Sequence, residues 1–254
     1  MWRVAVIAFN TFRENLRDRI LYNLLFFALL LIGASVLLAS LTIMEHHKIV
    51  TDMGLAAINL VGVIIAIFVG IGLVSKEIER RTVYTIMARP ISRTQFILGK
   101  YLGLVLTLSV NAVIMLIVYL ITLGMYRVPI HGGLFQAIQL IFIEWLLVTA
   151  IALFFSTFSS STLSAIMTLA FYVIGHLTAD FKGIAAKSQS EIVKAIMTGL
   201  YYVCPNLEVL NVKGPAAMGE AVSVPYEILA SLYGLLYAAL LLTGACMVFQ
   251  RRDF

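Results

Sequence analysis

The stretch Lys76–Lys100, KEIERRTVYTIMARPISRTQFILGK, is the one long interruption between apolar blocks of this chain that carries dense and mostly basic charge. A short basic loop between two apolar segments is typical of the cytoplasmic side of a membrane protein. We therefore expect residues 76–100 to form a cytoplasmic loop. Its charged residues are six bases (Lys76, Arg80, Arg81, Arg89, Arg93, Lys100) and two acids (Glu77, Glu79).

The pattern inside this stretch predicts a helix–turn–helix. Glu77 precedes Arg81 by four residues, the spacing of an ion pair on a helix. Pro90 cannot donate a backbone hydrogen bond and disfavours a helical residue before it, so the first helix should stop there. Ser92 or Thr94 can then cap a second helix that continues into the next apolar segment. Such a hairpin, held under the membrane, is shaped for contact with a cytoplasmic partner.

Composition assigns the chain to a broad class. Of its 254 residues, 61% are hydrophobic and 12% are charged, compared with about 25% charged in an average soluble domain. A soluble protein of this length could not bury so much apolar surface, so we expect an all-α integral membrane protein. The excess of basic residues lies beside apolar segments, which favours topology and contact with anionic lipid over nucleic-acid binding.

The apolar pattern predicts an amphipathic interfacial helix at residues 1–19, followed by six transmembrane helices. An extracytoplasmic segment, 180–227, precedes the last span, and its apolar stripe near 192–201 predicts a surface or re-entrant helix. Twelve of the 18 Lys and Arg residues fall inside in this topology, with both termini cytoplasmic. The expected spans are 20–44, 53–75, 101–126, 134–156, 161–179 and 228–250.

Two features within the spans stand out. Gly62, Ala66 and Gly70 recur every four residues, which permits close approach of another helix and favours a packing role over a transport role. Glu144 lies in the middle of an apolar span, where an ionised side chain costs about 2.5–3.5 kcal/mol on insertion scales. It is either a substrate-binding or proton-coupling carboxylate, or a partner in a hydrogen bond between helices. The candidate partners are Asn59, Asn111 and His176.

The sequence contains no motif for catalysis. It has no GxxxxGK[ST] nucleotide loop, no HExxH, no GxSxG and no CxxC pair. The adjacent residues Glu45, His46 and His47 lack the i, i+4 spacing of helical metal ligands, so no metal site is expected. We predict that the chain is not an enzyme and binds no cofactor itself.

Several motifs resemble the permease subunits of type-2 ABC exporters. They are KEIERRT at 76–82, ARPISR at 88–93, FILGKYLG at 96–103, PNLE at 205–208 and the ending RRDF at 251–254. In that family a charged end of the second span is followed by a proline turn and a GK-[FY]-LG opening of the third span. Arg81 stands where the family often has glycine.

The resemblance implies a mechanism in which ATP and Mg are bound by separate cytoplasmic ATPase subunits and two permease copies pair, as a homodimer or heterodimer, in the cytoplasmic (inner) membrane. Residues 1–19 would be a connecting helix. The hairpin 76–100 would be the coupling helix, which docks on the ATPase. The residues it assigns to that contact are Glu77, Glu79, Arg80, Arg81, Thr82, Arg89 and Arg93.

Other interpretations remain open. The arginines of the hairpin could serve only to fix topology and bind lipid headgroups. The chain could be a secondary transporter that uses Glu144 and His176 as coupling groups, with no ATPase. It could also be a non-transporting scaffold, or a transmitter of force to an extracytoplasmic protein. Association with an ATPase would separate the exporter and the transmitter from the secondary transporter.

Overall fold

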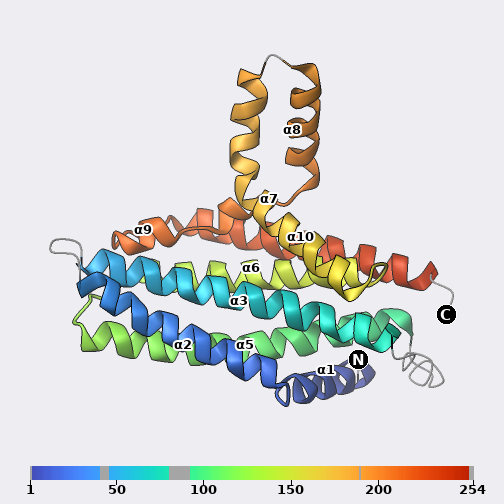
Figure 1. Ribbon diagram of the computed structural model, residues 1–254, viewed down its shortest axis with the longest axis horizontal. Helices are drawn as coiled ribbons and strands as arrows, with labels where there is room; N and C mark the ends of the chain where they lie inside the picture. Colours follow the sequence, from blue (N-terminus) through green and yellow to red (C-terminus); the bar gives the residue numbers. More distant parts are fainter. Residues whose placement is uncertain (1, 41–45, 80–91, 189, 252–254) are drawn as a thin grey trace.

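The computed structural model describes residues 2–40, 46–79, 92–188 and 190–251, and these residues are almost entirely helical (Figure 1). No strand occurs among them. The elements are α1 (Trp2–Asn15), α2 (Arg19–Ser40), α3 (His46–Glu79), α5 (Arg93–Met125), α6 (Gly132–Ser156), α7 (Ser161–Lys187), α8 (Glu191–Val203), the 3-10 helix η1 (Leu207–Leu210), α9 (Lys213–Ala217) and α10 (Val224–Arg251).

Five of these helices, α3, α5, α6, α7 and α10, are long and apolar enough to cross a membrane. The chain is therefore an integral membrane protein, as its composition predicts. The apolar part of α2 covers Leu21–Leu37 within the described residues, which is shorter than the other five. A count of six spans stays a prediction.

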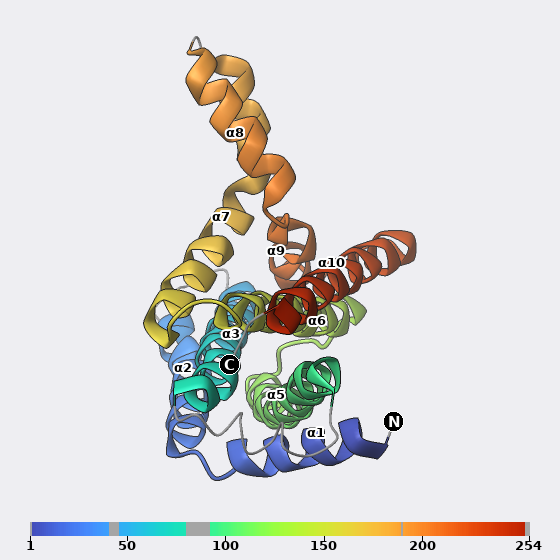
Figure 2. The ribbon, with the colours of Figure 1, turned by 90° about the vertical axis from the view of Figure 1, so that its right-hand side faces the viewer.

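The centre of the bundle is α6. It packs against α3, α5, α7 and α10, and Figure 2 shows it enclosed between α3 and α10 with α5 beneath. In its most apolar window 78% of the residues are buried, compared with 33% for α5 and α10. A helix that is apolar on all sides belongs in a core. The outer helices instead expose apolar residues such as Ile117, Ile121 and Leu240, as contact with lipid requires.

Several helices are longer than the hydropathy pattern indicates. α3 includes residues 46–52, which we expected in an outer loop, and Val50 within them is fully buried. α5 begins at Arg93, inside the basic hairpin, and α7 continues past the expected end at residue 179 to Lys187. Hydropathy marks where the chain enters lipid, and a helix can extend into water on either side of that boundary.

The end of α7 and all of α8 form a hairpin that projects from the bundle (Figures 1 and 2). None of the residues of α8 is buried. Its exposed apolar side chains include Ile192, Ile196 and Tyr202. We expected this segment as a surface or re-entrant helix. In the structure α8 packs against α7 and is directed away from the other helices.

The small residues of α3 face α6. A Cβ atom added at Gly62 would overlap the indole ring of Trp145, and one at Gly70 would lie 3.1 Å from the Cβ of Ala152. Ala66, between the two glycines, is fully buried. The ring of Trp145 thus occupies the space that the missing side chain of Gly62 leaves.

We predict that Gly62→Ala destabilises the protein, because Trp145 is buried and cannot move away without leaving its own contacts. Overpacking of this kind typically costs about 1–3 kcal/mol. The measurement is thermal unfolding of the purified protein in detergent. Gly33→Ala is the control, since a Cβ there would meet nothing within 4 Å. Equal unfolding midpoints for the two variants would contradict the packing role.

Candidate functional site

The first residues of α5 are fixed by a capping box. The side chain of Ser92 accepts a hydrogen bond from the backbone N–H of Gln95 (3.2 Å), and the side chain of Gln95 accepts one from the N–H of Ser92 (3.2 Å). Ser92 is one of the two residues that the sequence offers as a cap. This arrangement stabilises the start of a helix and sets the angle at which the chain enters it.

The same turn is bound to the end of α10. Arg93 donates hydrogen bonds from Nη1 to the carbonyl oxygens of Phe249 (3.1 Å) and Gln250 (2.9 Å). Gln250 donates back to the hydroxyl of Thr94 (3.0 Å), and the rings of Phe96 and Phe249 stack at 5.8 Å. A cation on the last carbonyls of a helix also offsets the negative end of its dipole. Arg93 therefore joins two helices whose contact residues lie 156 positions apart.

The second contact of α5 is with α1. Cβ atoms added at Gly99 and Gly103 would lie 2.7 Å from the Cβ of Ile7 and 2.6 Å from the Cβ of Thr11, so the two glycines allow α1 to pack closely. The buried Lys100 between them lies with its Nζ 3.6 Å from Glu14 Oε2.

Two further hydrogen bonds extend the contacts of α5. Asn15 donates to the hydroxyl of Thr107 (3.0 Å), which continues the contact with α1. Tyr101 donates to the carbonyl of Leu146 on α6 (3.2 Å). Gly99, Lys100 and Tyr101 thus each contact a residue of another helix. We call the contacts of Arg93–Thr107 with α1 and with the end of α10 the α5 junction.

Sequence reasoning missed the α5 junction, although one signal was present. Gly99 and Gly103 show the same four-residue spacing that indicates close packing in α3. The partners of Arg93 had no such signal.

Of the residues assigned to ATPase contact, Glu77 and Glu79 lie in the last turn and a half of α3. Arg80, Arg81, Thr82 and Arg89 lie outside the described residues.

A second group of interest is a buried polar cluster around Glu144, which is fully buried. Asn59 on α3 donates to Glu144 Oε2 (3.2 Å) and accepts from the indole N–H of Trp145 (3.1 Å). His176 on α7 lies with Nε2 3.4 Å from Glu144 Oε1. The cluster joins α3, α6 and α7. Asn111, the third candidate partner, donates to the carbonyl of Thr107 on its own helix instead (2.8 Å).

The η1 segment lies beside this cluster. A Cβ atom at Gly175, next to His176 in sequence, would lie 2.8 Å from Leu207 and 2.9 Å from the carbonyl oxygen of Pro205. A Cβ atom at Gly234 on α10 would meet Ile143, the neighbour of Glu144, at 2.6 Å. Gly175 therefore makes room for the PNLE segment beside His176, and Gly234 makes room for α6 beside Glu144.

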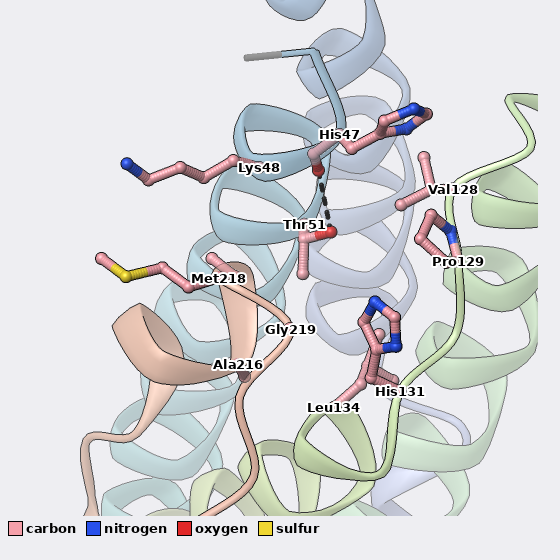
Figure 3. Close-up of a pocket in the computed structure, with 11 residues that line it drawn as sticks. His47, Lys48, Thr51, Val128, Pro129, His131, Leu134, Ala216, Met218 and Gly219 are labelled. Carbon is pink, nitrogen blue, oxygen red and sulfur yellow. Dashed lines mark hydrogen bonds between the residues drawn. The ribbon is translucent and has the colours of Figure 1, made fainter.

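A cavity of about 320 Å³ lies between the start of α3, the turn before α6, and α9 (Figure 3). In Figure 3 the His131 ring points into it, while the side chains of His47 and Lys48 extend to opposite sides. Among the residues that the structure describes, no acidic side chain lines it. Among the described residues, no group of three or more His, Cys, Asp or Glu could hold a metal ion. The walls of the cavity come from three separate segments of the chain.

A comparison with protein families agrees with this geometry. Residues 5–254 match the family model described as ABC-2 family transporter protein. The chain belongs to the ABC-2 transporter family. It is thus an ABC transporter permease, a class of membrane subunit. No curated protein sequence matches this permease significantly. The match covers both the α5 junction and the polar cluster.

We predict that Asn59→Leu destabilises the permease, because it leaves the buried Glu144 without its donor and Trp145 without its acceptor. The loss of a partner for a buried polar group costs about 1–3 kcal/mol, and more for a charged one. Asn111→Leu is the matched control, since Asn111 is equally buried but bonds only a backbone carbonyl of its own helix. Thermal unfolding in lipid nanodiscs measures both. A control variant as unstable as Asn59→Leu would contradict this role.

Proposed function

We propose that this permease is the membrane subunit of an ATP-driven exporter, on which a separate cytoplasmic ATPase acts through residues 76–100. The observation that carries the proposal is the α5 junction. The segment assigned to ATPase contact leads directly into Arg93, and Arg93 bonds the end of α10 while the next turns of α5 pack on α1.

This arrangement supports a mechanical role for the hairpin. The chain enters it from α3 and leaves it into α5, so a displacement of the hairpin acts on both helices. Because the first turns of α5 are bound to α1 and α10, the displacement reaches four helices at once. A loop that served only to fix topology would need charge, but it would not need these hydrogen bonds and this close packing.

The sequence indicates which subunit should bind ATP. ATP and Mg are expected in the ATPase, because the sequence of the permease contains no nucleotide loop. The expected assembly contains two ATPase subunits and a second permease copy, in the cytoplasmic membrane with both termini inside. The starts of α1 and α5 and the end of α10 lie toward one end of the bundle (Figure 1), which agrees with this orientation.

We predict that replacing Glu77, Arg80 and Arg81 together with alanine lowers the amount of ABC ATPase that copurifies with the tagged permease from native membranes. The reason is the loss of the charged contacts assigned to the hairpin. Membrane insertion should be unchanged.

The matched control is the triple alanine variant of Lys187, Glu191 and Lys194, which removes two bases and one acid from the α7–α8 hairpin. It should retain the ATPase. Undiminished ATPase in the first variant would contradict the coupling role.

A second candidate is the transmission of force to an extracytoplasmic protein, and the α7–α8 hairpin favours it. The hairpin projects sideways from the bundle, across its long axis (Figure 1), none of the residues of α8 is buried, and Ile192 and Tyr202 are largely exposed. Both candidates need the same ATPase. They differ in whether deletion of residues 182–203 abolishes function while ATP hydrolysis by the complex continues.

A further inference from the structure

The contact between His176 and Glu144 has an unusual feature. His176 Nδ1 lies 3.1 Å from the carbonyl oxygen of Tyr172 on its own helix. Its other nitrogen, Nε2, lies 3.4 Å from Glu144 Oε1, and both of these atoms are buried without a hydrogen-bond partner among the described residues. Two unsatisfied polar atoms therefore lie next to each other inside the bundle.

The number of protons at this contact follows from the chemistry of the groups. A carbonyl oxygen can only accept, so the hydrogen bond with Tyr172 requires a hydrogen on Nδ1 of His176. A neutral ring then has a lone pair on Nε2, which would lie opposite a carboxylate oxygen that also only accepts. One additional proton removes this conflict. It gives either an imidazolium beside a carboxylate or a neutral imidazole beside a carboxylic acid.

Both forms have a net charge of zero, and a neutral pair is favoured inside a membrane bundle. Glu144 is fully buried, and an uncompensated charge inside a membrane bundle is strongly unfavourable. On α3 the neighbouring group is the neutral amide of Asn59. The other titratable groups that act on the pair are Tyr172 on α7, Glu208 in η1 and Lys213 on α9. The charges of Glu208 and Lys213 are opposite, so their effects on the pair oppose each other, and that of Lys213 is the larger.

The pair also connects two parts of the bundle that differ in packing. In their most apolar windows 78% of the residues of α6 are buried, but only 22% of those of α7. α7 thus has the smaller share of its surface against the rest of the bundle, and it carries the projecting hairpin (Figure 1). The rings of Phe155 on α6 and Phe171 on α7 also meet, at 5.0 Å, so the contact between His176 and Glu144 adds a buried polar link to an apolar surface.

From this geometry we infer that Glu144 and His176 form a binding site for one proton, and that the bound proton holds α7 against α6. When α7 separates from α6, the proton returns to water and the link is lost. When α7 docks again, the site takes up one proton from water. The same proton binds and leaves, so no net proton movement across the membrane is required. This site is independent of the α5 junction.

The first test counts the proton. The wild-type permease, labelled with ¹⁵N-histidine in nanodiscs at pH 7.5, is examined by solid-state NMR for an imidazolium and by infrared spectroscopy for a protonated carboxyl. Glu144→Gln is the reference, because its amide can donate to Nε2 without any added proton. One of the two signals should be present in the wild type and absent from Glu144→Gln. The absence of both signals, or the presence of both, would overturn the inference.

The second test measures the link by hydrogen exchange of the α7 amides, with α5 in the same samples as the reference for folding. Glu144→Gln should leave exchange of α7 near the wild-type rate. Glu144→Leu should make it about tenfold faster, a factor that corresponds to about 1.4 kcal/mol and lies within the range for the loss of one hydrogen bond. If Glu144→Leu does not fold, His176→Leu provides the same comparison from α7. Unchanged exchange of α7 in a folded leucine variant would overturn the inference.

Discussion

The guanidinium of Arg93 on the last carbonyls of α10 is the contact on which the proposed mechanism depends. It binds the start of α5 to a helix end 156 residues away along the chain. The hydrogen bond from Gln250 to Thr94 and the stacked rings of Phe96 and Phe249 add to this contact. With it, and with α1 packed on Gly99 and Gly103, any force on the hairpin reaches the ends of several helices together. The family of ABC-2 transporters supplies the context in which such a force would arise.

The α5 junction and the interior of the bundle differ in how their helices are held together. At the α5 junction, charged and aromatic side chains fix helix ends to one another. Deeper in the bundle, glycines admit bulky neighbours: Gly62 accommodates Trp145, and Gly175 accommodates Leu207. The only acid in the middle of α6, Glu144, is held there by Asn59 and lies next to His176. α7 has fewer of its residues against the rest of the bundle than α6, and it carries the projecting hairpin (Figure 1).

Local signals in the sequence predicted local features well. Helical periodicity, membrane composition and the cap at Ser92 depend on residues near one another, and the structure agrees with them. Features that depend on distant residues were not accessible. No pattern in the sequence indicates that Arg93 meets Phe249, and the direction of α8 depends on how α7 leaves the bundle. Hydropathy also misplaced helix ends, since the helix at His46 begins in polar sequence.

In the proposed mechanism, α5 and α10 move as one unit when the ATPase acts. Pulsed electron paramagnetic resonance on the permease–ATPase complex tests it, with Cys204 and Cys246 replaced by serine and spin labels at exposed positions. The distance between Leu98 and Met247 should be the same with and without ATP, while that between Leu98 and Leu169 on α7 should change. A change in the first distance as large as in the second would contradict the account.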